Sequence, residues 1–124
     1  GSEIALLSIG PVGNLAQKAA EEAKKEGLNI LHFNMRFIKP IDSDALNYLS
    51  AKCKVIITVE DGSVNGGLFS AVSEFITLNS KSIKVIPLGV PDRFIEQGTI
   101  SELYKECGFD QDGIYKTILN VARK

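Results

Sequence analysis

Residues 4–35 read IALLSIGPVGNLAQKAAEEAKKEGLNILHFNM, and this stretch decides the fold class. Its two ends, residues 4–9 and 28–35, are short and nearly continuous runs of apolar or β-branched side chains. Strands have this composition when helices cover both faces of a parallel sheet. Between the two runs the apolar side chains recur with a period near 3.6, which indicates a helix. The stretch therefore predicts a strand, a crossover helix and a second, parallel strand.

The predicted crossover helix has recognisable ends. Asn14 is a good N-cap with Gln17 three residues later, and Gly27 is a natural left-handed residue after the last turn. The side chains expected to face the sheet are mostly small: Leu15, Ala19 and Ala23. Because these side chains are small, we expect this helix to approach the sheet closely.

The rest of the chain continues the alternation of strands and helices. Two more apolar runs occupy residues 55–59 and 83–88. Caps and apolar stripes predict four further helices: one from Asp42 to about Ala51, one after Gly66-Gly67 with Leu68, Val72, Phe75 and Ile76 on one side, one from Thr99 to Gly108, and one capped by Asp110 that buries Ile114, Ile118 and Val121. This alternation predicts a three-layer α/β/α domain with a doubly wound sheet of four parallel strands, and right-handed crossovers favour the order 2-1-3-4.

Composition narrows the class of protein. The 124 residues predict one domain over residues 3–124, and Gly1-Ser2 are interpreted as a cloning scar. Fourteen basic against fifteen acidic side chains leave no basic surplus for nucleic acid or anionic lipid. No apolar run approaches the ~20 residues of a membrane span. We therefore expect a soluble, cytoplasmic protein that binds neither nucleic acid nor membrane.

Two loops follow the strands that flank the switch point of this sheet, where doubly wound sheets bind ligands. Gly10-Pro11-Val12-Gly13 is neither a GxGxxG dinucleotide motif nor a P-loop. Residues 62–67 could offer free amides of the next helix to an anion, but a tight turn is the favoured interpretation. Glu60 and Asp61 are adjacent, so an acid/base pair there would need a bend in the strand.

The other residues that could carry chemistry give weak signals. His32 is the only histidine and lies inside a predicted strand, so a packed, hydrogen-bonded side chain is favoured over a metal ligand. No serine stands in a GxSxG motif. Cys53 and Cys107 form no CxxC pattern and are interpreted as reduced core thiols. We therefore expect no catalysis by this chain alone.

Three connections leave the carboxyl edge of the predicted sheet, residues 35–40, 59–67 and 88–98. They contain large apolar side chains at Phe37, Ile38, Phe94 and Ile95. Connections usually run over the surface, and a cluster of apolar residues there is typical of a surface that faces a partner. The three connections are therefore candidates for a contact surface.

Four motifs in this order resemble a known family: MRFIKPID at 35–42, TVEDGSVNGG at 58–67, LGVPDRFIEQG at 88–98, and Gly-Phe-Asp-x-x-Gly-Ile at 108–114. Together they resemble the C-terminal domain of the 1-deoxy-D-xylulose-5-phosphate synthase family, within the wider transketolase family. MRFIKP and the VEDG turn alone would also suit the beta subunit of 2-oxoacid dehydrogenases, and transketolase itself stays open as an alternative parent. Asp61 stands where the family often has Glu, and Gln97 where many members have His.

The resemblance implies a thiamine-diphosphate enzyme that condenses pyruvate with glyceraldehyde 3-phosphate, for isoprenoid and thiamine biosynthesis. In that family the two preceding domains hold the cofactor and Mg²⁺, and the Gly-Asp-Gly motif that binds them is missing from this sequence. No catalytic, cofactor-binding or metal-binding residue is therefore carried over. The family's sheet has a fifth, antiparallel edge strand, which we expect to be missing here.

We therefore expect an assembly module, inactive alone, that contacts the preceding domains of its own chain and a second subunit of a homodimer. A free-standing module that binds a small ligand at the switch point stays open as the alternative. The candidate contact residues are Arg36, Phe37, Glu60, Asp61, Asn65, Asp92, Arg93, Phe94 and Ile95.

Overall fold

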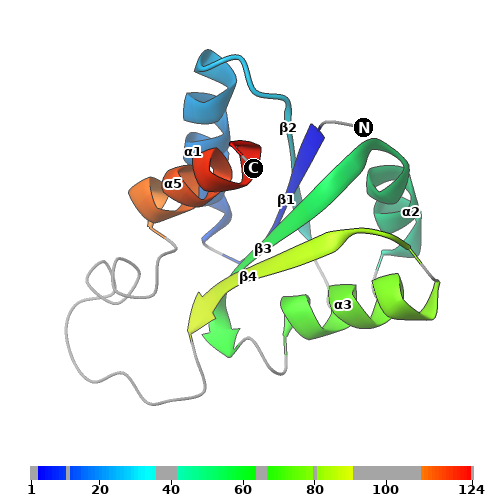
Figure 1. Ribbon diagram of the computed structural model, residues 1–124. Helices are drawn as coiled ribbons and strands as arrows, with labels where there is room; N and C mark the ends of the chain where they lie inside the picture. Colours follow the sequence, from blue (N-terminus) through cyan, green and yellow to red (C-terminus); the bar gives the residue numbers. More distant parts are fainter. Residues whose placement is uncertain are drawn as a thin grey trace.

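Strands and helices alternate along the chain in the computed structural model, which describes residues 3–10, 12–35, 42–63, 67–79, 81–90 and 110–123. The elements are β1 (Glu3–Ile9), α1 (Gly13–Lys25), β2 (Ile30–Met35), α2 (Ser43–Lys52), β3 (Cys53–Ser63), α3 (Leu68–Leu78), β4 (Lys84–Val90) and α5 (Gln111–Ala122). Figure 1 shows them in sequence colours. The helix predicted from Thr99 to Gly108 lies outside the described residues.

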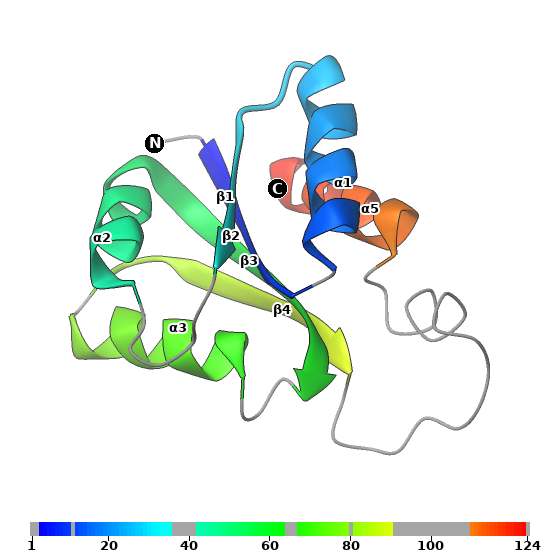
Figure 2. The same ribbon diagram turned by 180° about the vertical axis from the view of Figure 1, so that it is seen from behind.

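The four strands form one sheet in the order β2-β1-β3-β4, and every neighbouring pair is parallel. This is the predicted order. Helices α1 and α5 cover one face, while α2 and α3 cover the other, as the opposite views in Figures 1 and 2 show. The result is the three-layer α/β/α arrangement that the alternation of elements predicts.

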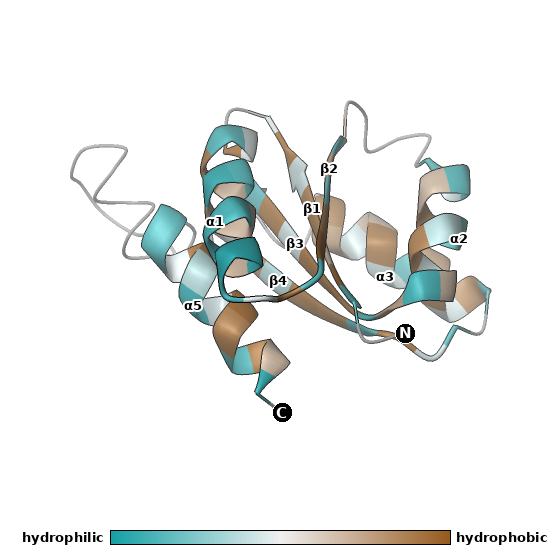
Figure 3. Cartoon of the chain, turned by 90° about the horizontal axis from the view of Figure 1, so that it is seen from above, coloured by the Kyte–Doolittle hydropathy of each residue, from teal (hydrophilic) through white to brown (hydrophobic). Residues whose placement is uncertain are grey.

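The two faces of the sheet belong to two apolar cores. On β1, Ile4 and Leu6 pack under α1 and α5, while Ala5 and Leu7 pack on the side of α2 and α3. All four side chains are buried, which explains why this strand is a continuous apolar run rather than an alternating one. Figure 3 shows the same pattern, with apolar colour along the strands and hydrophilic colour over much of α1.

Helix α1 differs in detail from its prediction. Its N-cap is Val12 and makes no side-chain cap, so Asn14 lies inside the helix and is exposed. The reason is a tight turn, in which the amide of Gly13 donates to the carbonyl of Gly10 at 3.0 Å, with Gly10 at φ 82°. Leu15 is only partly buried, and the buried side chains are Ala16, Ala19, Ala20 and Ala23. Close packing through small side chains is confirmed.

The predicted caps of two other helices are confirmed. The Asp42 side chain accepts a hydrogen bond from the Ala45 amide at 3.0 Å, and Asp110 accepts from the Gly113 amide at 2.8 Å. Carboxylates at helix N-termini satisfy free amides and favour the positive end of the helix dipole. The caps thus fix where α2 and α5 begin.

Strand β3 is longer than predicted, because it continues beyond Val59 to Ser63. Its pairing with β4 shifts register after Val59 and resumes at Ser63, opposite Val90. Glu60 and Asp61 therefore belong to the end of a strand with an irregularity, rather than to an open loop. An acid/base pair of Glu60 and Asp61 would need a bend here, and the register shift marks an irregularity in the strand, but the Asp61 side chain lies outside the described part of the structure.

Candidate functional site

Glu60 lies at the carboxyl end of β3 and is the one charged residue that is buried among the described residues, with 4% of its surface exposed. Its two carboxylate oxygens accept separate hydrogen bonds from the backbone amides of Leu68 and Phe69, each at 3.0 Å. Both amides belong to the first turn of α3. Glu60 therefore caps, across eight residues, a helix whose own N-cap, Gly67, has no side chain. We call this arrangement the Glu60 clasp.

The Glu60 clasp explains the glycine before α3. A Cβ atom at Gly67 would lie 1.7 Å from Oε1 of Glu60, far inside van der Waals contact. The φ angle of Gly67 is −116°, so a left-handed conformation is not the reason for glycine here, whereas the lack of space beside Glu60 is a reason. The carboxylate and the bare Cα of Gly67 fit together as one unit.

The Glu60 clasp also bears on the anion site that the sequence left open at residues 62–67. A helix N-terminus binds an anion through its unpaired amides. At α3 two of those amides already bind the chain's own carboxylate. Those two amides are therefore not free to bind an anion, which favours the interpretation as a turn; residues 64–66 of the connection lie outside the described residues.

Only two of the nine candidate contact residues belong to the part of the chain that the structure describes. Glu60 is buried and serves the clasp, and the backbone of Asp61 continues β3. In this chain the Glu60 carboxylate is covered, and its place in a contact surface stays a prediction. The other seven lie outside the described residues: Arg36, Phe37, Asn65, Asp92, Arg93, Phe94 and Ile95.

His32 is packed and hydrogen-bonded through both ring nitrogens, as predicted. Nε2 lies 2.7 Å from Oγ of the buried Ser8, and Nδ1 lies 2.7 Å from Oε1 of Gln17. Gln17 donates its amide to Glu21, so its oxygen accepts from Nδ1–H. Burial, with a smaller contribution from the Lys24 charge, lowers the pKa of His32, so the ring is neutral and Ser8 donates to Nε2.

Sequence reasoning missed the partners of His32. Ser8 and His32 occupy even positions of neighbouring strands, so their side chains fall on the face covered by α1. The signal available in the sequence for this pair was that Ser8 and His32 are polar residues within two otherwise apolar runs. The order of groups resembles a nucleophilic triad, but Ser8 is fully buried and its hydroxyl cannot reach a substrate. The network is therefore a means of satisfying buried polar groups.

The His32 network predicts a pH dependence of stability. The folded chain has a lowered His32 pKa, whereas the unfolded chain regains a value near 6.5. As the pH falls below 6.5 the unfolded state binds the proton first, so the free energy of unfolding decreases until the folded pKa is passed. Urea unfolding between pH 5 and 7.5 should show a steeper loss for the natural chain than for His32→Gln. Equal slopes would contradict this assignment.

The remaining groups do not form a reactive centre within the described residues. Burial, reinforced by the Glu3 carboxylate, raises the pKa of the Cys53 thiol to about 11, and Cys53 is free, as predicted; Cys107 lies outside the described residues. No group of three or more His, Cys, Asp or Glu side chains able to hold a metal occurs in the part of the chain described. None of the described helices is long and apolar enough to cross a membrane.

Comparison with known proteins gives a consistent set of relatives. The family model "Transketolase, C-terminal domain" matches residues 1–114. The chain is 48% identical over 122 residues to 1-deoxy-D-xylulose-5-phosphate synthase of Cytophaga hutchinsonii, covering 98% of this chain and 19% of that protein. It is 41% identical over 119 residues to the synthase of Bacteroides fragilis, covering 95% and 18%. The chain thus spans about a fifth of the length of these curated relatives.

Solved structures show the same fold. A structure described as "Split gene transketolase, inactive beta4 tetramer" superposes with a TM-score of 0.88 at 27% identity, covering 99% of this chain and 40% of that one. Transketolase from Campylobacter jejuni superposes with a TM-score of 0.67 at 20% identity over 95% of this chain and 17% of that one. At 20% identity, the likeness to the Campylobacter jejuni transketolase shows the shared fold alone. The resemblance noted in the sequence motifs is confirmed.

Proposed function

The chain belongs to the transketolase C-terminal domain family, and from this membership we propose that it is the assembly domain of a longer thiamine-diphosphate-dependent synthase. The synthase would condense pyruvate with glyceraldehyde 3-phosphate to 1-deoxy-D-xylulose 5-phosphate, in the cytoplasm. The domain would contact the preceding domains of its own chain and a second subunit of a homodimer. Turnover would need those other parts.

One observation carries the proposal: nearly all of this chain matches about a fifth of each synthase relative. A segment of that size is a single structural domain within a longer enzyme. The matched split-gene transketolase chain is itself described as an inactive tetramer, which is the behaviour expected of a chain that assembles without the rest of its enzyme.

The groups at the start of α3 do not fit the cofactor of such an enzyme. Mg²⁺ and a diphosphate need carboxylates and free amides. The buried carboxylate of Glu60 and the first amides of α3 already bind each other. We therefore propose that thiamine diphosphate and Mg²⁺ are held outside this chain, and we derive no catalytic step for its residues.

The test uses the longer synthase that contains this domain. Replacing both Arg93 and Phe94 by alanine removes one charged and one aromatic side chain from a proposed contact connection. Arg and aromatic residues are the side chains that most often dominate interface energies. We expect the dimer to dissociate at least tenfold more readily in sedimentation equilibrium, and turnover per protein to fall with dimer content.

A matched control changes Lys18 and Tyr48 to alanine, which also removes one cation and one exposed aromatic ring, but from α1 and α2. This variant should keep the natural dimer constant. The proposed contact role is lost if the Arg93/Phe94 variant dimerises and turns over like the natural enzyme.

A further inference from the structure

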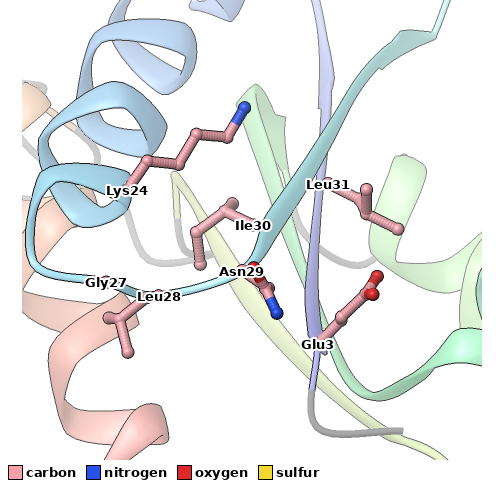
Figure 4. A pocket seen from close by; sticks show the side chains of 7 residues that line it. All are labelled: Glu3, Lys24, Gly27, Leu28, Asn29, Ile30 and Leu31. Carbon is pink, nitrogen blue, oxygen red and sulfur yellow. The ribbon is translucent and has the colours of Figure 1, made fainter.

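Three neighbouring hollows lie along the amino-terminal edge of the sheet, opposite the carboxyl ends of the four strands. The first, of about 410 Å³, is lined by residues from α1, β2 and the start of β1, including Lys24 and Glu3 (Figure 4). It shares Glu3, Leu28 and Asn29 with the second, of about 280 Å³. The second shares Val55 and Val121 with the third, of about 250 Å³. The shared residues make them one feature, the amino-edge groove.

The amino-edge groove is basic although the whole chain has a net charge of −1. Lys24, Lys54 and Lys84 line it, and all three side chains are exposed. None of these ammonium groups forms an ion pair with a described carboxylate. Four further cations lie at the same end of the described elements: Lys25, Lys52, Lys81 and Arg123. The described acids at this end are Glu3 and Glu26.

Helix dipoles favour cations at this end of the domain. Lys24, Lys25 and Lys52 occupy last turns of helices, where cations offset the partial negative charge. Lys54 and Lys84, however, belong to the first residues of strands β3 and β4. Both nevertheless line the groove beside the last turn of α5, which contains no basic residue of its own. The carboxyl ends of helices therefore explain why cations gather at this edge, whereas no described carboxylate pairs with the three lysines of the groove.

The groove is also apolar along its floor and has the size of a short peptide. Ile4, Leu28, Val55, Ile86 and Val121 line it between the lysines. It crosses four strands spaced by ~4.8 Å, or roughly 14 Å, which matches four or five residues of extended chain at ~3.3 Å each. Oε2 of Glu3 is buried in this edge without a described hydrogen-bond partner, so it can accept a backbone amide.

We propose that the amino-edge groove binds an extended, acidic polypeptide segment with alternating apolar side chains. The acidic residues of the segment complement the charge of the three unpaired lysines, and its apolar side chains pack on the apolar floor of the groove. The segment comes from the longer chain outside these 124 residues, because Glu3 and Ala122, near the two ends of the described chain, both line the groove. Polypeptide continuing from either end would start beside it at high effective concentration. The source of the segment rests on the proposed function, whereas its chemistry does not.

The chemistry is tested with the 124-residue chain and a fluorescent peptide of sequence Asp-Ile-Glu-Val-Asp-Leu. We expect saturable binding in fluorescence anisotropy, weakened at least tenfold by the double variant Lys54→Glu, Lys84→Glu and weakened by added salt. The control Lys18→Glu, Lys116→Glu makes the same change in net charge on α1 and α5, and should bind as the natural chain does. Circular dichroism establishes that each variant is folded.

Three outcomes of the peptide titrations would overturn the proposed chemistry, and a fourth comes from competition with pyrophosphate. The first three are no saturable binding, equal weakening in both double variants, or equal binding of the peptide with Lys in place of Asp and Glu. Displacement by equimolar inorganic pyrophosphate would also overturn it, since the groove would then be a small-anion site. None of these outcomes bears on dimerisation, so failure here is distinguishable from failure of the proposed function.

The source is tested by zero-length carbodiimide cross-linking in the longer synthase. Mass spectrometry should find amide links from Lys54 or Lys84 to Asp or Glu side chains outside residues 1–124. Links only to carboxylates within residues 1–124 of a second copy would assign the groove to that copy and overturn the proposed source, as would the absence of links from both lysines.

Discussion

Replacing Glu60 by alanine is expected to lower the free energy of unfolding by about 3 kcal/mol or more, a large part of the stability of a domain of this size. The variant removes a carboxylate that accepts two hydrogen bonds, and it leaves the amides of Leu68 and Phe69 without their partner. Hydrogen bonds to a charged group are worth roughly 1.5–3 kcal/mol each, and an unsatisfied buried amide costs about as much. The start of α3 would lose its cap.

The glutamine variant separates hydrogen bonding from size. Glu60→Gln keeps the shape, but its NH₂ group cannot accept from one of the two amides, so about half of the loss is expected. Glu74→Gln makes the same chemical change on the exposed side of α3 and should shift stability by less than about 0.5 kcal/mol. Urea unfolding followed by circular dichroism measures all three. Equal midpoints for Glu60→Ala and Glu74→Gln would show that the clasp contributes nothing.

The sheet could be predicted because its signals are local. Each strand is an apolar run, each crossover contains a helical stripe, and Asp42 and Asp110 mark helix starts within three residues of the amides that they cap. Once the elements alternate, the handedness of crossovers leaves few strand orders. None of these predictions depends on which residues, far apart in sequence, come together in space.

The Glu60 clasp could not be predicted because its signal is not local. The carboxylate and the amides that it caps are eight and nine residues apart, and a cap is normally sought at the residue before the helix. That residue is Gly67, which has no side chain. Glu60 was therefore assigned to a contact surface, because a charged residue at the end of a strand is usually exposed.

The hydrogen-bond partners of His32 and the first residue of α1 could not be predicted from the sequence either. Ser8 and Gln17 reach the imidazole from β1 and α1, and only the pairing of β1 with β2 brings the three together. The turn from Gly10 to Gly13 begins α1 before Asn14, although Asn14 is the better cap by residue type. Tertiary contacts decide the first feature, whereas a local backbone turn outweighs the residue preference in the second.

Replacing Gly67 by alanine is expected to cost nearly as much as losing the clasp. Alanine adds one methyl group, and its Cβ would lie 1.7 Å from Oε1 of Glu60, so the carboxylate must leave the two amides or α3 must move. Overpacking of this kind costs about 1–3 kcal/mol. The φ angle of Gly67 lies outside the left-handed region, so we attribute the loss to the contact with Glu60.

A double-mutant cycle tests that attribution directly. In the natural background Gly67→Ala should lower the free energy of unfolding by about 2 kcal/mol, whereas in the Glu60→Ala background it should change it by less than about 0.5 kcal/mol. The difference between these two changes in unfolding free energy is the coupling energy between residues 60 and 67. The two changes should therefore be far from additive. If their effects simply add, the methyl group meets some other obstacle, and glycine at position 67 serves the backbone rather than the Glu60 clasp.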